Sequence, residues 1–466
     1  TGSSVCTPTR YGVITGRYAW RTPLQKGVLG GLSPRLIEPG RLTVAELLRQ
    51  NGYYTACIGK WHLGMDWVKL PGKDVSQLSI ETPEQVGNVD YTKPIAGGPT
   101  SVGFDNYFGI AASLDMVPYT FIENDHVTAV PNVDKQFPMV PGNDQKMTRK
   151  GPSTADFDIT HVLPTFTKKV VDTIDQHADA AKAGKPFFLY VPLNSPHTPI
   201  APSKQWQGKS GLNAYADFVM QTDASIGEML DALDRNGLTD NTLVIVTSDN
   251  GCSPSANFEE LATHGHNPSY IFRGNKADIY DGGHRVPFLV RWPGKVKAGG
   301  QSNQLLCLTD FMATCADMLG VTLPANAGED SFSFLPALSG TSGRPMREAI
   351  VHHSINGSFA IRRGQWKLEM CPGSGGWSAP RPGKDDTSAM PLVQLYNLQY
   401  DIGEKQNVEA QHPDVVSDLT HLLETYVTSG RSTPGEAQKN DVTVDIWKAA
   451  QEAHQPRAAK KKAKPS

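Results

Sequence analysis

The stretch Leu243-Val244-Ile245-Val246-Thr247-Ser248-Asp249-Asn250-Gly251 is a short apolar run that ends in a polar turn. It follows an amphipathic pattern that ends at Gly237, and this order is typical of a helix leading into a strand buried on both faces. Such strands occur in parallel sheets that helices cover. Because ligands bind beyond the carboxyl ends of these strands, the stretch predicts a site that includes Asp249 and Asn250.

The same order of helix, apolar strand and polar turn occurs twice more in the chain. Each helix is expected from its apolar spacing, and the first also carries the capping pair Thr43 and Glu46. The two units comprise residues 43–52, 54–58 and 59–64, and residues 162–174, 187–193 and 194–197. The polar turns of all three units are therefore expected to meet at one edge of the sheet.

These patterns predict an α/β fold, an α/β/α sandwich with a large, mostly parallel mixed sheet. Residues 65–155, rich in Pro, Gly and Asp, are expected to form a long excursion over the active-site face and to shape the substrate pocket. Short strands at 348–352, 359–363 and 366–369 predict a small antiparallel C-terminal subdomain. We expect a catalytic domain at 1–342, this subdomain at 343–430, and an extension at 431–466 with a disordered basic tail.

The composition indicates a globular chain and excludes several function classes. The chain has 466 residues, 39% of them apolar, and a formal net charge of −3, so no general attraction to nucleic acid is expected. No apolar run approaches the roughly 20 residues of a membrane span. The six cysteines are too scattered for a disulfide scaffold or a zinc site.

The strongest local signal is Cys6-Thr7-Pro8-Thr9-Arg10, followed by Thr15-Gly16-Arg17. Pro8 suits the first turn of a helix, which places Cys6 at a helix N-terminus, where backbone N–H groups favour an anion. Arg10 adds a planar fork of donors for oxyanions. The alternative interpretation is a buried structural cysteine beside a capped helix.

Together with four further motifs, this one resembles the type I, formylglycine-dependent sulfatase family, in particular its arylsulfatase A-like members. Cys-x-Pro-x-Arg is the sequence that sulfatase-maturating enzymes recognise when they oxidise the cysteine to formylglycine. The similar segments are Cys6 to Arg17, Gly52 to Gly64, Ser195-Pro196-His197, Ser248 to Gly251, and Lys276 leading to Tyr280 to Pro287. The resemblance implies an alkaline-phosphatase-like fold and hydrolysis of the sulfate esters of a carbohydrate or an aryl alcohol.

The resemblance also implies a mechanism and a role for each motif residue. Hydrated formylglycine at position 6 would supply a geminal diol, one hydroxyl attacking sulfur and the other later expelling sulfate. Arg10 and Lys60 would orient and neutralise the diol and the sulfate, and His62 would handle a proton on the diol. His197 and Lys276 would contact the sulfate and the bridging oxygen, with His197 as the general acid.

A divalent cation, Ca²⁺ or Mg²⁺, is implied as well, with Asp249, Asn250 and the modified residue 6 as its ligands. The roles of Asp281, His284 and Arg285 are less specific; Asp281 is expected to support Lys276 without touching substrate. His352 and His353 are expected either to line the pocket or simply to end a strand.

Members of this family carry, before the nucleophile, a strand that ends in an acidic pair and supplies two more metal ligands. The sequence begins at Thr1, directly before the nucleophile motif. We therefore expect a sheet without that inner strand and weak or no activity in this chain. The resemblance further implies a periplasmic or extracellular location and a formylglycine-generating enzyme as a partner.

Two other functions remain open at this point. A phosphomonoesterase or phosphodiesterase of the same superfamily would share the fold, but such enzymes use Ser or Thr as nucleophile and a second metal set, which the sequence does not reveal. A non-catalytic binder of sulfated glycans would use the same basic residues without turnover. The identity of the sulfate ester does not follow from the sequence.

Overall fold

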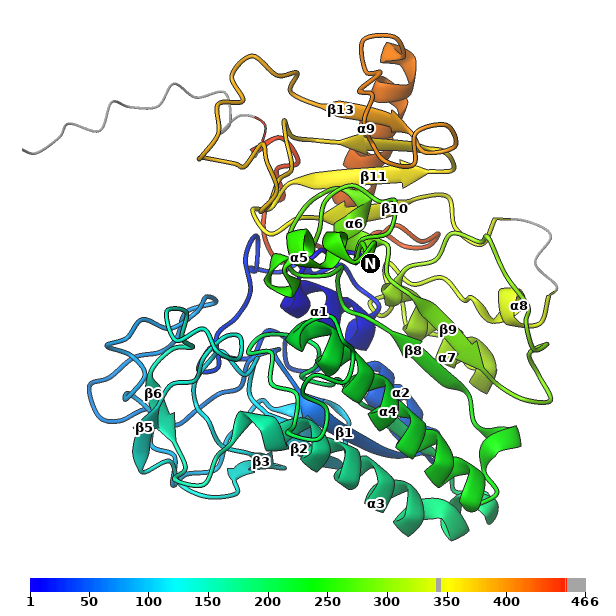
Figure 1. Ribbon diagram of the computed structural model, residues 1–466. Helices are drawn as coiled ribbons and strands as arrows, with labels where there is room; N and C mark the ends of the chain where they lie inside the picture. Colours follow the sequence, from blue (N-terminus) through cyan, green and yellow to red (C-terminus); the bar gives the residue numbers. More distant parts are fainter. Residues whose placement is uncertain (341–344, 449, 451–466) are drawn as a thin grey trace, which may run out of the picture.

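The computed structural model describes residues 1–340, 345–448 and 450. Figure 1 shows a helix-covered sheet region, and a second sheet with helix α9 at the opposite end of the molecule. The basic tail expected at 460–464 lies outside the described residues. No helix in the described part is long and apolar enough to cross a bilayer.

The helices are α1 (Cys6–Thr15), α2 (Val44–Gln50), α3 (Val162–Lys182), α4 (Ala214–Arg235), α5 (Phe258–Thr263), α6 (Asp281–His284), α7 (Phe311–Leu319), α8 (Leu335–Leu338) and α9 (Pro413–Thr428). The strands are β1 (Tyr54–Lys60), β2 (Asn106–Ile110), β3 (Ile122–Glu123), β4 (His126–Val127), β5 (Val133–Lys135), β6 (Gly151–Ser153), β7 (Phe187–Tyr190), β8 (Val244–Thr247), β9 (Phe288–Arg291), β10 (Ile350–His353), β11 (Phe359–Arg363), β12 (Trp366–Glu369) and β13 (Gln394–Asn397).

The central sheet is mixed, with the order β4-β3-β2-β1-β7. β1 runs parallel to both β2 and β7, while β3 and β4 are antiparallel additions at one edge. Successive residues of β1 face opposite cores: Cys57 packs with Tyr11 of α1, and Ile58 packs with Phe166 of α3. α3 and α4 lie side by side on one face (Figure 1), which confirms the predicted sandwich.

The structure corrects the prediction of a single excursion at residues 65–155. Asn106–Ile110 is an inner strand of the central sheet, parallel to β1, with Ile110 opposite Lys60. The segment Asn-Tyr-Phe-Gly-Ile lacks a β-branched run and contains a glycine, so the pattern of apolar residues gave little indication of a strand. The remainder of 65–155 does consist largely of turns, with the small β5–β6 hairpin.

The apolar strand β8 was expected to belong to the parallel sheet, and the structure corrects this expectation. It pairs antiparallel with β9 in a separate two-stranded sheet. Both β7 and β8 are half-buried along most of their length, and within residues 1–340 and 345–448 neither has a second strand on its other side. An apolar run indicates burial but does not specify which strand lies beside it, and this accounts for the difference.

The C-terminal sheet β10-β11-β12-β13 is antiparallel throughout, as predicted, and the strands at 359–363 and 366–369 have the expected bounds. α9 covers one face of this sheet through Leu419 and Leu423. The same core includes Tyr18 and Trp20, which follow α1. The second sheet is thus joined directly to the segment that carries Cys6.

Candidate active site

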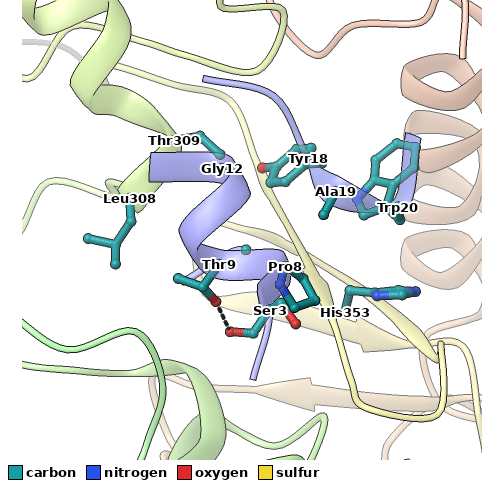
Figure 2. A pocket seen from close by; sticks show the side chains of 11 residues that line it. Ser3, Pro8, Thr9, Gly12, Tyr18, Ala19, Trp20, Leu308, Thr309 and His353 are labelled. Atoms are coloured by element: carbon teal, nitrogen blue, oxygen red, sulfur yellow. Dashed lines mark hydrogen bonds between the residues drawn. The ribbon is translucent and has the colours of Figure 1, made fainter. Parts of the chain in front are cut away.

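Helix α1 presents Cys6 at its first residue, as the sequence predicts. Val5 precedes it in extended conformation and contributes no side-chain cap, so the first backbone N–H groups of the helix are not satisfied by a capping side chain. Thr9 donates its hydroxyl to the carbonyl of Ser3 (2.8 Å), which fixes the entry into the helix (Figure 2). Cys6 is buried, with 3% of its surface exposed.

Arg10, one turn further along α1, joins three segments of the chain. Its Nε and Nη2 atoms contact Oδ2 of Asp249 at 2.9 and 2.8 Å. Its Nη1 atom donates to the carbonyl oxygen of Lys60 at 2.8 Å. The guanidinium therefore connects α1 with the carboxyl ends of β1 and β8.

The turn after β1 places Lys60 and His62 in the interior. Lys60 ends the strand, with its backbone N–H donated to Pro192 (2.7 Å), and its side chain is buried. His62 has a left-handed φ of 59° and contacts the carbonyl of Leu29 through Nε2 at 2.8 Å. Because that carbonyl requires a donor, Nε2 carries the proton, and the buried Nδ1, which lacks a protein partner, is an acceptor.

Four of the predicted residues act on the thiol of Cys6. Burial alone would raise its pKa, but the ammonium groups of Lys276 and Lys60 hold the pKa well below its usual value, and the rings of His197 and His62 lie beside the sulfur atom. Two lysines and two histidines from three segments of the chain therefore surround the sulfur atom. Such a site stabilises negative charge at position 6.

The two histidines are held neutral by the same surroundings. Burial, with Lys276 and Lys60 nearby, lowers the pKa of His197. Burial, with Lys60 nearby, lowers the pKa of His62. Nδ1 of His197 donates to the carbonyl of Thr198 at 2.6 Å, which leaves Nε2 to interact with the thiol.

Asp249 and Asn250 lie beyond the end of β8 and face this cluster. Burial would raise the pKa of Asp249, yet Arg10, Lys60 and Lys276 lower it. Oδ1 of Asn250 is buried and has no protein partner, while its Nδ2 donates to the carbonyl of Gly251. The carboxylate of Asp249 therefore lies near the thiol, and the next residue carries a buried amide oxygen without a protein partner. Among the described residues, no group of three or more His, Cys, Asp or Glu side chains is arranged to hold a metal.

Asp281, His284 and His352, whose predicted roles were less specific, are also buried. Asp281 is buried and forms ion pairs with Arg285 (3.0 Å) and Lys367 (3.0 Å). His284 and His352 are also buried, with ring centroids 4.5 Å apart, and both contact Thr1.

A small cavity with room for about one water molecule lies beside α1 and is lined by Pro8, Thr9 and Gly12 of that helix. Figure 2 shows it between α1, the residues before and after that helix, and the segment at Leu308 and Thr309. His353, which was expected either to line the pocket or to end a strand, ends β10 and borders this cavity. The cavity is too small for a sulfate ester and is separate from the candidate site.

Two further polar residues that the sequence motifs did not indicate, Ser113 and Asp115, follow β2 at the same edge of the sheet. Burial would raise the pKa of Asp115, but His197, Arg149 and Lys60 lower it. Arg149 donates to Oδ2 of Asp115 at 2.9 Å, and the hydroxyl of Ser113 is buried without a protein partner. Assigning β2 as a strand would have drawn attention to these residues, because they come directly after its carboxyl end.

A mixed sheet with polar and charged side chains gathered beyond its carboxyl ends is typical of an α/β enzyme with a site for an anionic group. Comparison with known proteins identifies the family. The sulfatase family model matches residues 1–321, and a model described as the C-terminal part of N-sulphoglucosamine sulphohydrolase matches residues 274–369.

The chain is 34% identical over 457 residues to N-acetylgalactosamine-6-O-sulfatase of Bacteroides thetaiotaomicron, which covers 91% of this chain and 84% of the relative. It is 29% identical to human arylsulfatase A, over 92% of this chain and 81% of the relative. A solved structure from work on glycosaminoglycan metabolism by B. thetaiotaomicron matches with a TM-score of 0.75 and 34% identity, over 91% of this chain and 89% of that one.

The chain belongs to the sulfatase family. It is a sulfuric ester hydrolase, and its fold is the alkaline-phosphatase-like fold of its structural neighbours.

Proposed function

We propose that this sulfatase cleaves the sulfate ester of a sugar, using formylglycine made from Cys6. The observation that carries the proposal is the arrangement of Lys60, Lys276, His62 and His197 around the sulfur atom of Cys6. When hydrated, the aldehyde supplies a hydroxyl nucleophile to the sulfate ester. The protein's task is then to hold a tetrahedral anion against that hydroxyl and to protonate the leaving alcohol.

Each surrounding side chain has a part in this task. The ammonium groups of Lys60 and Lys276 neutralise the sulfate oxygens in a buried site, where electrostatic stabilisation is strong. Arg10 orients the carboxylate of Asp249 and the end of β1. His62 accepts a proton at Nδ1, since its Nε2 proton is held by the carbonyl of Leu29. A bound sulfate anion beside His197 favours a second proton on its ring at Nε2, and His197 then donates that proton to the departing alcohol.

The residues at the end of β8 fit a hard divalent cation, Ca²⁺ or Mg²⁺. Asn250 offers a buried oxygen without a protein partner, and Asp249 offers a carboxylate beside it. Together with an oxygen of the modified residue 6, these are the ligands proposed for the ion, and water or substrate would complete the 6 to 8 oxygens that Ca²⁺ prefers. The ion would supply charge neutralisation at the sulfate oxygens.

A sulfated amino sugar is the substrate class we favour. The support is the similarity to the N-acetylgalactosamine-6-O-sulfatase over most of both chains. We further propose a periplasmic or extracellular location and maturation by a formylglycine-generating enzyme. Cell fractionation and mass spectrometry of the Cys6 peptide would test these two points.

The function is tested with protein coexpressed with a maturating enzyme. Sulfate release is measured from 6-O-sulfated N-acetylgalactosamine, an aryl sulfate and, as comparison, a sugar phosphate, before and after treatment with EDTA. In protein that also carries the family's acidic strand before the nucleophile motif, we expect turnover of the sulfated sugar, loss of turnover with EDTA, recovery with Ca²⁺ or Mg²⁺, and none in Cys6→Ala. For the chain that begins at Thr1 we expect weak or no turnover. Faster release of phosphate than of sulfate would instead indicate a phosphoesterase, and binding of the sulfated sugar without turnover would indicate a glycan binder.

A further inference from the structure

Lys276 sits in a turn whose backbone is strained. The turn is closed at both ends: the backbone N–H of Asp278 donates to the carbonyl of Asn275 (3.1 Å), and the N–H of Asn275 donates to Oδ2 of Asp278 (2.9 Å). Its third residue, Ala277, has a φ of 82°, a left-handed conformation that glycine normally adopts. A conformation of this kind is unfavourable for a residue with a side chain and persists only where neighbouring structure imposes it.

The neighbouring structure on one side is the nucleophile segment. The N–H of Ala277 donates to the carbonyl of Ser4, two residues before Cys6, at 2.9 Å. The N–H of Lys276 donates to the carbonyl of Cys252 at 2.8 Å. These contacts fix the backbone of Lys276 relative to the thiol and to the end of β8.

On the other side, the loop between β12 and β13 holds the same turn. The carboxylate of Asp278, which is fully buried, accepts the N–H groups of Trp377 (2.7 Å) and Ser378 (2.9 Å) and the hydroxyl of Ser378. The N–H of Ile279 donates to the carbonyl of Ser374 at 2.7 Å. A carboxylate buried in this way is stabilised by the donors that surround it, so it fastens the turn to the loop.

Lys367 of β12 provides the second fastening. Its ammonium group is fully buried and donates to the carbonyl of Ile279 (2.9 Å), Oδ1 of Asp281 (3.0 Å) and Oε1 of Glu404 (2.6 Å). Glu404 in turn accepts the N–H of Asp281 at 2.7 Å. The start of α6 is therefore held by two side chains from the C-terminal sheet region.

We propose that Asp278 and Lys367 are positioning residues through which the C-terminal sheet region holds Lys276 at the sulfate pocket. The proposal rests on the proposed role of Lys276 in binding sulfate. It assigns to the region after residue 345 a direct part in sulfate recognition, although Lys276 itself comes from the preceding region. Loosening either contact allows the strained turn to relax, and the ammonium group of Lys276 then moves away from the sulfur atom at position 6.

The test compares Asp278→Asn and Lys367→Met with the unaltered chain and with Lys276→Ala. Binding of inorganic sulfate is measured by isothermal titration calorimetry on protein whose Cys6 is unmodified, so that turnover is not needed. The kcat and KM of the matured proteins are then compared. We expect sulfate affinity to fall on the order of 10-fold or more in both variants, and kcat to fall more than KM rises, because a displacement of about 1 Å can reduce a rate 100-fold.

The matched control is Asp330→Asn. Asp330 is also a fully buried carboxylate that accepts two backbone N–H groups, from Tyr18 (2.8 Å) and Ser432 (3.1 Å), but it does not contact the turn that carries Lys276. We expect this variant to be less stable and yet to bind sulfate with unchanged affinity. Ser378→Ala removes the hydroxyl that donates to Asp278 and accepts a hydrogen bond from Nδ2 of Asn275 (2.9 Å). It is the milder variant should the others fail to fold, and it is expected to weaken sulfate binding by a smaller factor.

Unchanged sulfate affinity and kcat in the folded variants of Asp278, Lys367 or Ser378 would overturn the proposal. An equal loss of affinity in Asp330→Asn would also overturn it, because the effect would then reflect stability alone. If the unaltered chain does not bind sulfate at all, the proposed function itself fails, and this outcome is distinct from a failure confined to the variants.

Discussion

At the scale of single residues, Arg10 has contacts that a lysine cannot reproduce. Its guanidinium contacts Asp249 through two nitrogens and the carbonyl of Lys60 through a third. A lysine would keep the positive charge, but its single nitrogen could reproduce only one of these contacts. We expect Arg10→Lys to lower kcat/KM for sulfate-ester hydrolysis on the order of 100-fold.

The control for this variant is Arg49→Lys. Arg49 forms an exposed ion pair with Glu46 on the surface of α2, at 2.8 Å. Loss of the guanidinium group of Arg49 is expected to leave kcat/KM within a factor of about two, since exposed ion pairs contribute little to stability. Equal activity in Arg10→Lys and the unaltered enzyme would contradict the role given to Arg10.

The thiol of unmodified Cys6 is expected to ionise at lower pH than an ordinary cysteine. The nearby ammonium groups of Lys276 and Lys60 hold its pKa well below the usual value, so the thiolate persists to lower pH than that of an ordinary cysteine. Cys252 is the internal comparison, because burial raises its pKa to about 11. Mass spectrometry of iodoacetamide-treated protein from pH 5 to 10 would follow both.

We expect the alkylation rate of Cys6 to reach half its maximum at a lower pH than that of Cys252. Coinciding profiles for the two thiols would contradict the charge arrangement described for the site.

The polar turns after the predicted strands and the helix start at Cys6 indicated most of the side chains gathered around Cys6, and the family resemblance supplied Lys276. The structure brings Arg10, Lys60, His62, His197, Lys276 and Asp249 into one cluster, with Asn250 next to Asp249 in the chain. Their catalytic and metal-binding roles stay predictions. Ser113 and Asp115 were not predicted, because they follow β2, a strand that the pattern of apolar residues did not indicate. The supports of Lys276 are long-range contacts, which no local pattern encodes.

At the scale of elements, α2 illustrates a local signal that tertiary structure preserves. The hydroxyl of Thr43 accepts the N–H of Glu46 at 3.0 Å and so caps the helix, as the sequence predicts. We expect Thr43→Ala to lower the free energy of unfolding by about 1 kcal/mol, measured by urea denaturation, with the kinetics of sulfate release unchanged.

Thr173→Ala serves as its control. The hydroxyl of Thr173 donates to the carbonyl of Lys169 within α3, where the backbone hydrogen bonds are already made. A change within about 0.5 kcal/mol is expected there. Equal losses in the free energy of unfolding for the two substitutions would show that the hydroxyl of Thr43 stabilises the protein no more than a hydroxyl within a helix does.

Helices and apolar strands were predictable because their periodicity is local. The pairing of strands was not, since it depends on which edges meet in space. β8 illustrates this: its apolar residues correctly indicate a strand, but its antiparallel partner β9 lies about 40 residues further along the chain. β2, with Asn106 and Gly109 in five residues, lacked even the local signal.

At the scale of the whole molecule, buried ion pairs join the nucleophile segment to distant parts of the chain. Arg21 contacts Asp330 at 2.8 Å, with both side chains fully buried, and donates to the carbonyl of Tyr426. We expect Arg21→Met to lower the free energy of unfolding by about 3–5 kcal/mol, because it leaves the carboxylate of Asp330 buried and unpaired.

Chemical denaturation would measure this loss, and Arg49→Met on the surface of α2 provides the comparison, with an expected change below about 1 kcal/mol. A loss in Arg21→Met no larger than in Arg49→Met would contradict the structural importance of the pair. Such contacts join segments that lie more than 200 residues apart in the chain.

The most direct test of the account is a crystal structure of the matured protein soaked with inorganic sulfate. We expect one sulfate ion beside the modified residue 6, with Lys60 and Lys276 within hydrogen-bonding distance of its oxygens and His197 adjacent. Sulfate bound only elsewhere on the protein, with these side chains directed away from residue 6, would contradict it.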